Sequence, residues 1–264
     1  MGKLSWSAAM GLVALGCGTE VSAPNYDEET EHSESAIQSS DDDFEVDFQG
    51  CSEIASIAVL PYAVARPLVP AEYELAGDGT IALLVVRIAN CSNVVIDGDA
   101  TGSGTVAQIG VTIVPPDGDG DINNYTVFYD TDGKDLAKAL KKAGVNARYV
   151  KKLDYDLDLG AGTLAIDVPS PSKARYSVTT QVIAPTAAAV PFVANWWQLD
   201  EDGETKMNTT LPSIQFGGAD TTVNTKPGSK LDDILGATTF DSFPVLDSFN
   251  TFPAAHMIVD RRDD

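Results

Sequence analysis

The sequence predicts a mainly β fold, namely a closed or strongly curved β-barrel with one or two short helices. Short runs rich in valine, isoleucine, threonine and aromatic residues recur along the chain, and glycine, aspartate and proline separate them. Only two segments carry a helical pattern. Once the N-terminal segments described below are set aside, about 215 residues remain, which suits one domain with a substantial core.

The expected strands follow from these runs. Residues 80–90 are almost continuously apolar, as in a strand buried on both faces, and Asp202-Gly203 between two strand-like runs predicts a hairpin. The full set of expected strands is 80–90, 106–114, 125–129, 164–168, 176–183 and 192–199.

Two helices are expected. The first has Asp132 as its cap, an apolar stripe over residues 136–143 and Gly144 at its end. A second, shorter helical turn is expected over residues 230–235.

The N-terminus resembles the export signal of a bacterial lipoprotein. A short apolar run in residues 1–16 ends with the small residue Gly16 before Cys17, and the run is too short to span a bilayer permanently. The resemblance implies a signal peptide over residues 1–16, a lipidated Cys17 and, because Gly18 is not aspartate, the outer membrane of the envelope. Ala14 stands where such signals usually carry leucine, so an ordinary secretory signal is the alternative. Both predict export.

An acidic tether is expected between the lipidated Cys17 and the folded domain, over residues 17–48. Residues 18–48 contain eleven acidic residues and no lysine or arginine, and such a segment self-repels and stays solvated. The barrel domain is then residues 49–264, with 28 acidic against 16 basic residues, a net charge of −12. This charge repels phosphate backbones and anionic lipids, so we expect no nucleic-acid partner, and membrane contact only through the lipid anchor.

Cys51 and Cys91 are the two cysteines left in the expected domain. An even pair in an exported chain favours a disulfide. Two buried free thiols are the alternative.

The sequence gives little support for a metal site or a hydrolase triad. His256 is the only histidine of the expected domain and no G-x-S-x-G elbow is present, which argues against a hydrolase triad. Asp117, Asp119 and Asp121 form a weak calcium candidate, because the glycine and glutamate of an EF-hand loop are missing after them. A solvated loop between two strands is favoured there. No cofactor is expected.

Lys151 is the candidate catalytic residue. If residues 148–159 form one strand, alternation puts Lys151 on the same face as Tyr149 and Leu153, so that loss of solvation disfavours its ammonium form. The neighbouring charge of Lys152 acts in the same direction. A neutral amine is what Schiff-base chemistry requires. The alternative is that Lys151 lies at a strand end and reaches water.

The chain resembles the acetoacetate decarboxylase-like proteins in four segments that occur in the family's order. These are 67–75, 125–132, 149–153 and 243–245 with the following His256. The resemblance implies a cone-like β-barrel with an interior pocket, Lys151 as the Schiff-base lysine and Lys152 as its neighbouring cation.

Departures from the family pattern concern the groups around that lysine. Val150 replaces the family's proline, and Arg66 is out of register with its arginine. The acidic residue of the family's early strand has no counterpart in residues 80–86, and Arg87 is the only charge of the run 80–90. The leading hypothesis is therefore a lipid-anchored envelope protein whose barrel binds a small apolar or carbonyl-containing ligand, such as a keto acid. The alternatives are a Schiff-base lyase acting on a keto acid and an envelope scaffold without a small-molecule site.

Overall fold

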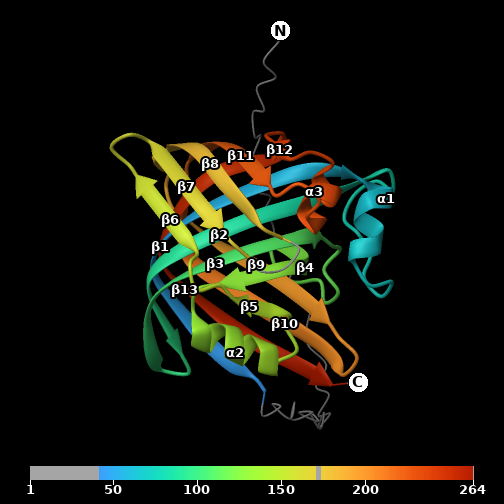
Figure 1. Cartoon of the computed structure of the whole chain (residues 1–264). Helices are drawn as coiled ribbons and strands as arrows, with labels where there is room; N and C mark the ends of the chain where they lie inside the picture. The colour runs from blue at the N-terminus through green and yellow to red at the C-terminus, as the bar shows by residue number, and fades with distance from the viewer. Residues whose placement is uncertain (1–41, 171–173, 264) are drawn as a thin grey trace, which may run out of the picture. The chain divides into compact units, whose positions relative to one another are not determined.

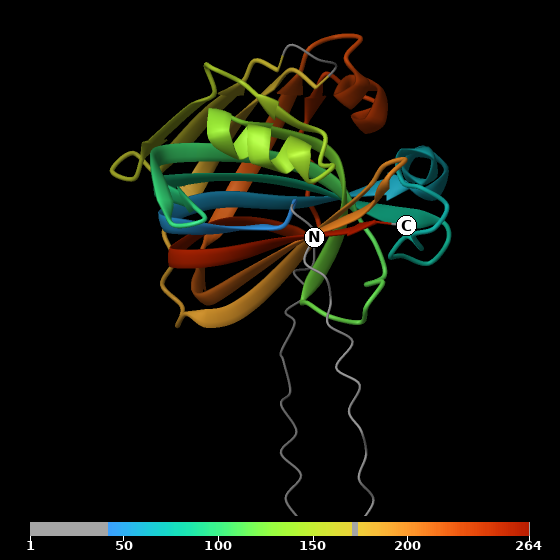
Figure 2. The same cartoon turned by 90° about the horizontal axis from the view of Figure 1, so that it is seen from below.

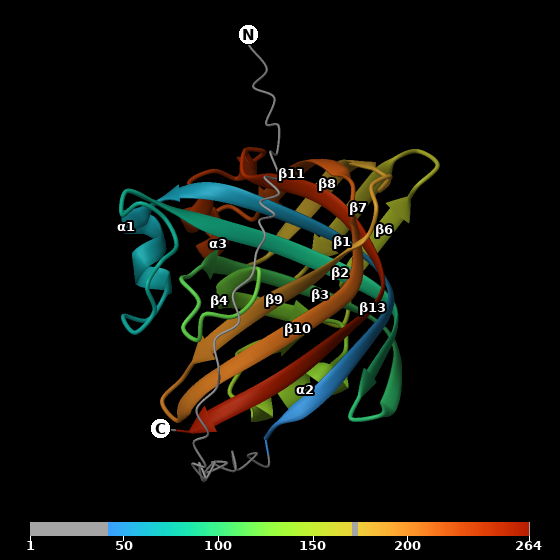
Figure 3. The ribbon, with the colours of Figure 1, turned by 180° about the vertical axis from the view of Figure 1, so that it is seen from behind.

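A ring of strands forms the centre of the structure, a computed structural model that describes residues 42–170 and 174–263. The ring strands are β1 (Phe44–Pro61), β2 (Ile81–Ile96), β3 (Asp99–Thr112), β4 (Ile122–Thr131), β9 (Val190–Leu199), β10 (Gly203–Phe216) and β13 (Leu246–Asp263). They pair in the order β3-β2-β1-β13-β10-β9-β4, and a β3–β4 pairing closes the barrel. Figure 3 shows β9, β10, β13, β1 and β2 side by side in its wall. The expected closed barrel is confirmed.

A second, smaller sheet packs on the outside of the barrel. It contains β6 (Asp154–Asp158), β7 (Thr163–Val168), β8 (Tyr176–Ile183), β11 (Gly218–Thr225) and β12 (Thr239–Phe240), in the order β12-β11-β8-β7-β6 (Figure 1). One apolar cluster joins the outward side chains of the barrel, such as Ile54, to inward side chains of this sheet, such as Val178. A second cluster fills much of the barrel interior.

Helix α2 (Lys134–Lys142) faces the viewer across the barrel strands in Figure 2. Its buried Leu136 and Leu140 belong to the interior cluster, so α2 closes one end of the barrel. Gly144 ends the helix as expected, with a positive φ of 81° that glycine adopts readily. The expected cap at Asp132 is wrong: Gly133 occupies the N-cap position without a side-chain bond, and Asp132 instead accepts a hydrogen bond from the Thr105 backbone.

The remaining elements are short. They are α1 (Tyr62–Ala65), the 3₁₀ turn η1 (Arg66–Leu68), β5 (Ala147–Tyr149), which pairs in parallel with β4, and α3 (Lys230–Leu235), which matches the second expected helix. No helix in the described ranges is both long and apolar enough to cross a membrane.

The barrel begins within the segment expected as tether. Strand β1 starts at Phe44, and Phe44, Val46 and Phe48 are buried while the residues between them are exposed or acidic. The boundary at residue 48 is therefore wrong, because alternating acids on the outer face gave this half-strand the composition of a solvated segment. Residues 1–41, with the expected signal peptide and Cys17, lie outside the described residues.

The Cys51–Cys91 disulfide is confirmed. The two residues stand directly opposite each other in the β1–β2 register, with Cα atoms 4.1 Å apart. The bond therefore ties together the first two strands of the barrel.

Candidate functional site

A cavity lies inside the barrel between β1, β2, β4, β9, β10 and β13. Successive side chains of a strand point to opposite faces, so Glu53, Ala55 and Ile57 of β1 face the cavity while Ile54 packs against the outer sheet. Most of the lining is apolar. Phe192 and Phe216 contact each other edge to face, with ring centroids 5.9 Å apart.

The cavity is small. The space open to the centre of a water molecule is about 60 Å³. A single water needs on the order of 10–15 Å³ on this measure, so the cavity suits a molecule of a few heavy atoms.

A row of polar side chains crosses four adjacent strands on the inner face, and we call Asn250, Glu53, Arg87 and Gln108 the polar ladder. Asn250 Nδ2 donates to Glu53 Oε1 (3.0 Å), Arg87 Nε donates to Glu53 Oε2 (2.6 Å), and Arg87 Nη1 donates to Gln108 Oε1 (2.5 Å). Glu53 stands opposite Asn250 and Arg87 stands opposite Gln108 in the strand registers, while Glu53 and Arg87 are diagonal neighbours. The barrel register thus assembles the ladder from β13, β1, β2 and β3.

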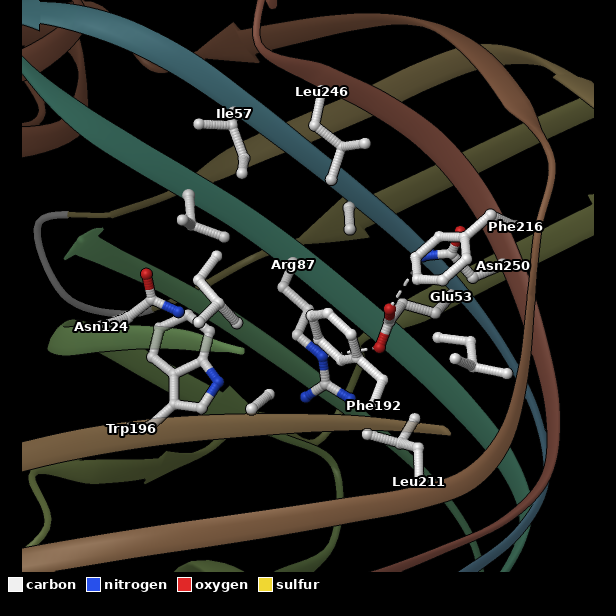
Figure 4. A pocket seen from close by; sticks show the side chains of 15 residues that line it. Glu53, Ile57, Arg87, Asn124, Phe192, Trp196, Leu211, Phe216, Leu246 and Asn250 are labelled. Carbon is white, nitrogen blue, oxygen red and sulfur yellow. Dashed lines mark hydrogen bonds and ion pairs between the residues drawn. The ribbon is translucent and has the colours of Figure 1, made fainter. Parts of the chain in front are cut away.

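The ladder leaves one nitrogen of Arg87 without a hydrogen-bond partner among the described residues. Both Glu53 oxygens are occupied, as are Nε and Nη1 of Arg87, whereas Arg87 Nη2 has no partner among the described residues. Figure 4 shows the guanidinium among the lining side chains, with Glu53 and Asn250 on one side and Trp196 and Asn124 on the other. Arg87 therefore presents an N–H group to an otherwise largely apolar cavity.

Asn124 of β4 supplies a second polar group to the cavity wall. Its Oδ1 accepts a hydrogen bond from Thr112 Oγ1, and its Nδ2 has no partner among the described residues. The wall therefore offers donors at two points.

A smaller cavity on the other side of the ladder is lined by Arg87, Gln108 and Tyr129 among others, and by Cys91 of the disulfide. Complete burial raises the pKa of the Tyr129 hydroxyl, and the nearby Arg87 charge offsets this only in part. Tyr129 accordingly stays neutral, and Arg87 is the residue that the two cavities share.

Lys151 and Lys152 lie in the turn between β5 and β6, and both are exposed. The expected single strand over residues 148–159 is wrong, because its apolar positions belong to two strands. Val150 and Leu153 anchor the turn in the core outside the barrel, which leaves the two lysines at its tip. Among the described residues that line the cavity, none is a lysine. The catalytic assignment of Lys151 and Lys152 stays a prediction.

The aspartates considered for calcium bind different partners. Asp117 forms an ion pair with Lys206, and Asp121 Oδ2 accepts a hydrogen bond from the Val193 backbone at 2.7 Å. Asp119 donates its backbone N–H to Asp117. Over the described ranges, no three His, Cys, Asp or Glu residues are grouped to hold a metal ion.

A second buried carboxyl lies outside the barrel cavity. Asp130 of β4 is buried; its Oδ1 accepts a hydrogen bond from Ser170, and its Oδ2 has no partner among the described residues. Burial raises the pKa of Asp130, although the Ser170 hydrogen bond and the Arg148 charge lower it.

The sequence contained a signal for part of this site. Arg87 is the only charge in an apolar run, which is typical of a buried, paired cation. Glu53, Gln108 and Asn250 have no such local signal, because only strand register brings them to Arg87.

Comparison with known proteins identifies the fold. No protein-family model and no curated protein matches the chain. Among solved structures, it is similar to an acetoacetate decarboxylase (TM-score 0.55, 13% identity, 82% of this chain and 87% of the other). It is also similar to an acetoacetate decarboxylase-like enzyme from Sphingomonas wittichii RW1 (TM-score 0.51, 10% identity, 85% and 93% covered). A third similar structure is the enduracididine biosynthesis enzyme MppR complexed with pyruvate (TM-score 0.51, 12% identity, 88% and 92% covered). The chain therefore has the acetoacetate decarboxylase-like fold.

Proposed function

We propose that this chain is a binding protein of the bacterial cell envelope, whose barrel holds a small, largely apolar molecule with a carbonyl group. The observation that carries the proposal is the Arg87 guanidinium, which is held by the ladder and directs an N–H group into the cavity. Nη2 of Arg87 has no partner among the described residues, so an acceptor oxygen on a ligand could form a charge-assisted hydrogen bond with it. The apolar wall would receive the rest of the molecule.

A keto acid is one form of this ligand. MppR, which shares the fold, is described in complex with pyruvate. The small volume of the cavity agrees with a molecule of that size.

Schiff-base catalysis is the second candidate function. It is favoured by the fold shared with a decarboxylase and by the family-like segment 149–153. Such chemistry needs an amine next to the bound carbonyl. Since the described cavity lining contains no lysine, we favour binding over catalysis.

Lipid anchoring of the protein rests on the sequence. Acyl chains on Cys17 would hold the domain at the membrane, and the acidic segment that follows would keep it clear of the headgroups. Gly18 favours the outer membrane by the resemblance described above.

Butanone is a suitable probe for the cavity, because it is small, apolar and carries one carbonyl oxygen. We expect it to bind the full chain and to change the fluorescence of Trp196, which lines the cavity. Ala194 lines the cavity as well, so Ala194→Leu should fill the space and abolish binding. Ala165→Leu makes the same change at an exposed position of β7 and should bind like the wild type. Equal binding by the wild type and Ala194→Leu would refute the proposed site.

A further inference from the structure

The hydrogen bonds of Arg87 restrict the group that can bind to it. Arginine grips a carboxylate through two N–H groups on neighbouring nitrogens, either Nε with Nη2 or Nη1 with Nη2. Glu53 takes the single N–H of Nε, and Gln108 takes one of the two N–H groups of Nη1. The fork of Nε with Nη2 is therefore closed, and a ligand can reach only the N–H groups left on Nη1 and Nη2.

The charge of the cavity points in the same direction. Among the described residues that line the two cavities, Glu53 and Arg87 are the only charged side chains, and they neutralise each other as an ion pair. A bound carboxylate would add an uncompensated negative charge to a largely apolar space, which is costly.

The remaining polar atoms of the wall do not supply a counter-charge. Asn124 is a neutral amide. Asn250 Oδ1 is a buried acceptor without a partner among the described residues, so its partial negative charge opposes an anion.

We infer that the barrel selects uncharged carbonyl compounds, such as short ketones or amides, and rejects the corresponding carboxylates. The inference rests on the proposed function and narrows its ligand class: a keto acid would have to lose its charge or displace Glu53 to bind.

Butyramide and butyrate provide a matched test, since they have the same shape and differ in charge. Calorimetric titration of the wild-type chain near neutral pH should show butyramide binding more tightly, by about tenfold or more. Butyrate should gain affinity as the pH falls through the pKa of butyric acid, while butyramide should not. Equal or tighter binding of butyrate near neutral pH would overturn the inference.

A Glu53→Gln variant tests the cause of the selectivity. The substitution keeps the size of the side chain and leaves the Arg87 charge uncompensated, so the preference should shift toward butyrate. Glu72→Gln makes the same change at an exposed position and should keep the wild-type preference. An unchanged preference in Glu53→Gln would contradict the charge argument, and the wild-type pH profile remains decisive if that variant does not fold.

The outcomes separate this inference from the proposed function. If butyrate binds at least as tightly as butyramide near neutral pH and Ala194→Leu abolishes its binding, the cavity is a ligand site and the inference alone fails. If neither compound nor butanone binds, the proposed function fails and the inference fails with it.

Discussion

Replacing Arg87 by methionine should destabilise the protein strongly, because it leaves the Glu53 carboxylate buried with only the Asn250 amide as partner. Removal of one member of a buried ion pair costs about 3–5 kcal/mol. The Arg87 side chain keeps 18% of its surface exposed and Glu53 only 6%. Since Arg87 is partly hydrated, we expect the lower end of that range, about 3 kcal/mol.

The assay is urea unfolding with the disulfide intact, followed by circular dichroism. Adding Glu53→Gln to Arg87→Met removes the orphaned charge and should recover at least about half of the loss. Arg262→Met is the control, because its pair with Asp260 is exposed (52% and 32%) and should contribute less than about 1 kcal/mol. A loss in Arg87→Met no larger than that in Arg262→Met, or no recovery in the double variant, would refute the account of the ladder.

Four further predictions follow from the rest of the chain. Cys17→Ser should move the protein from the detergent phase to the aqueous phase and remove acyl chains from its intact mass; a mature wild-type protein without lipid mass would contradict the anchor. Reduction of the disulfide, which spans 40 residues, should lower the free energy of unfolding by about 4 kcal/mol on the chain-entropy model, measured by urea unfolding with and without reductant. Borohydride with a β-keto acid should label the exposed Lys151 and Lys152 without preference, and Lys151→Arg should leave butanone binding unchanged. Selective labelling of Lys151, together with carbon dioxide release that is lost in Lys151→Arg, would instead establish the lyase. Burial raises the pKa of Asp130 in the folded state, so the protein loses stability when this carboxyl ionises, as pH rises from the unfolded value of 3.8 through the folded value. Asp130→Asn should therefore raise the free energy of unfolding near neutral pH, and raise it less at acid pH. A gain independent of pH would contradict this.

The sequence predicted those strands whose patterns are local. Residues 176–183 alternate buried and more exposed positions, and β8 has the same bounds. By contrast, β1 and β13 were not among the expected strands. The first half of β1 alternates apolar with acidic residues, a period-two pattern, but its many acids gave it the composition of a solvated segment. It pairs with β2 and with β13, and no local pattern reports the pairing with β13, which lies far along the chain.

Only one residue of the candidate site could be recognised from the sequence around it. Arg87 stood out as a charge in an apolar run, but its partners depend on the registers of three strand pairs. The alternation of side chains over residues 148–159 predicted an apolar environment for Lys151, and this was wrong. A turn divides these residues, and the alternation of a strand does not continue through a turn.

The pairing of β1 with β13 sets the time at which the protein can fold. Phe44, at the start of β1, stands opposite Val259, near the end of β13. During synthesis, the barrel therefore stays open until nearly the whole described chain has emerged. Contacts that close such long loops form slowly. A chain that has to be threaded through a translocation channel, as proposed for this one, would therefore remain unfolded long enough to pass, and its disulfide would form on the far side.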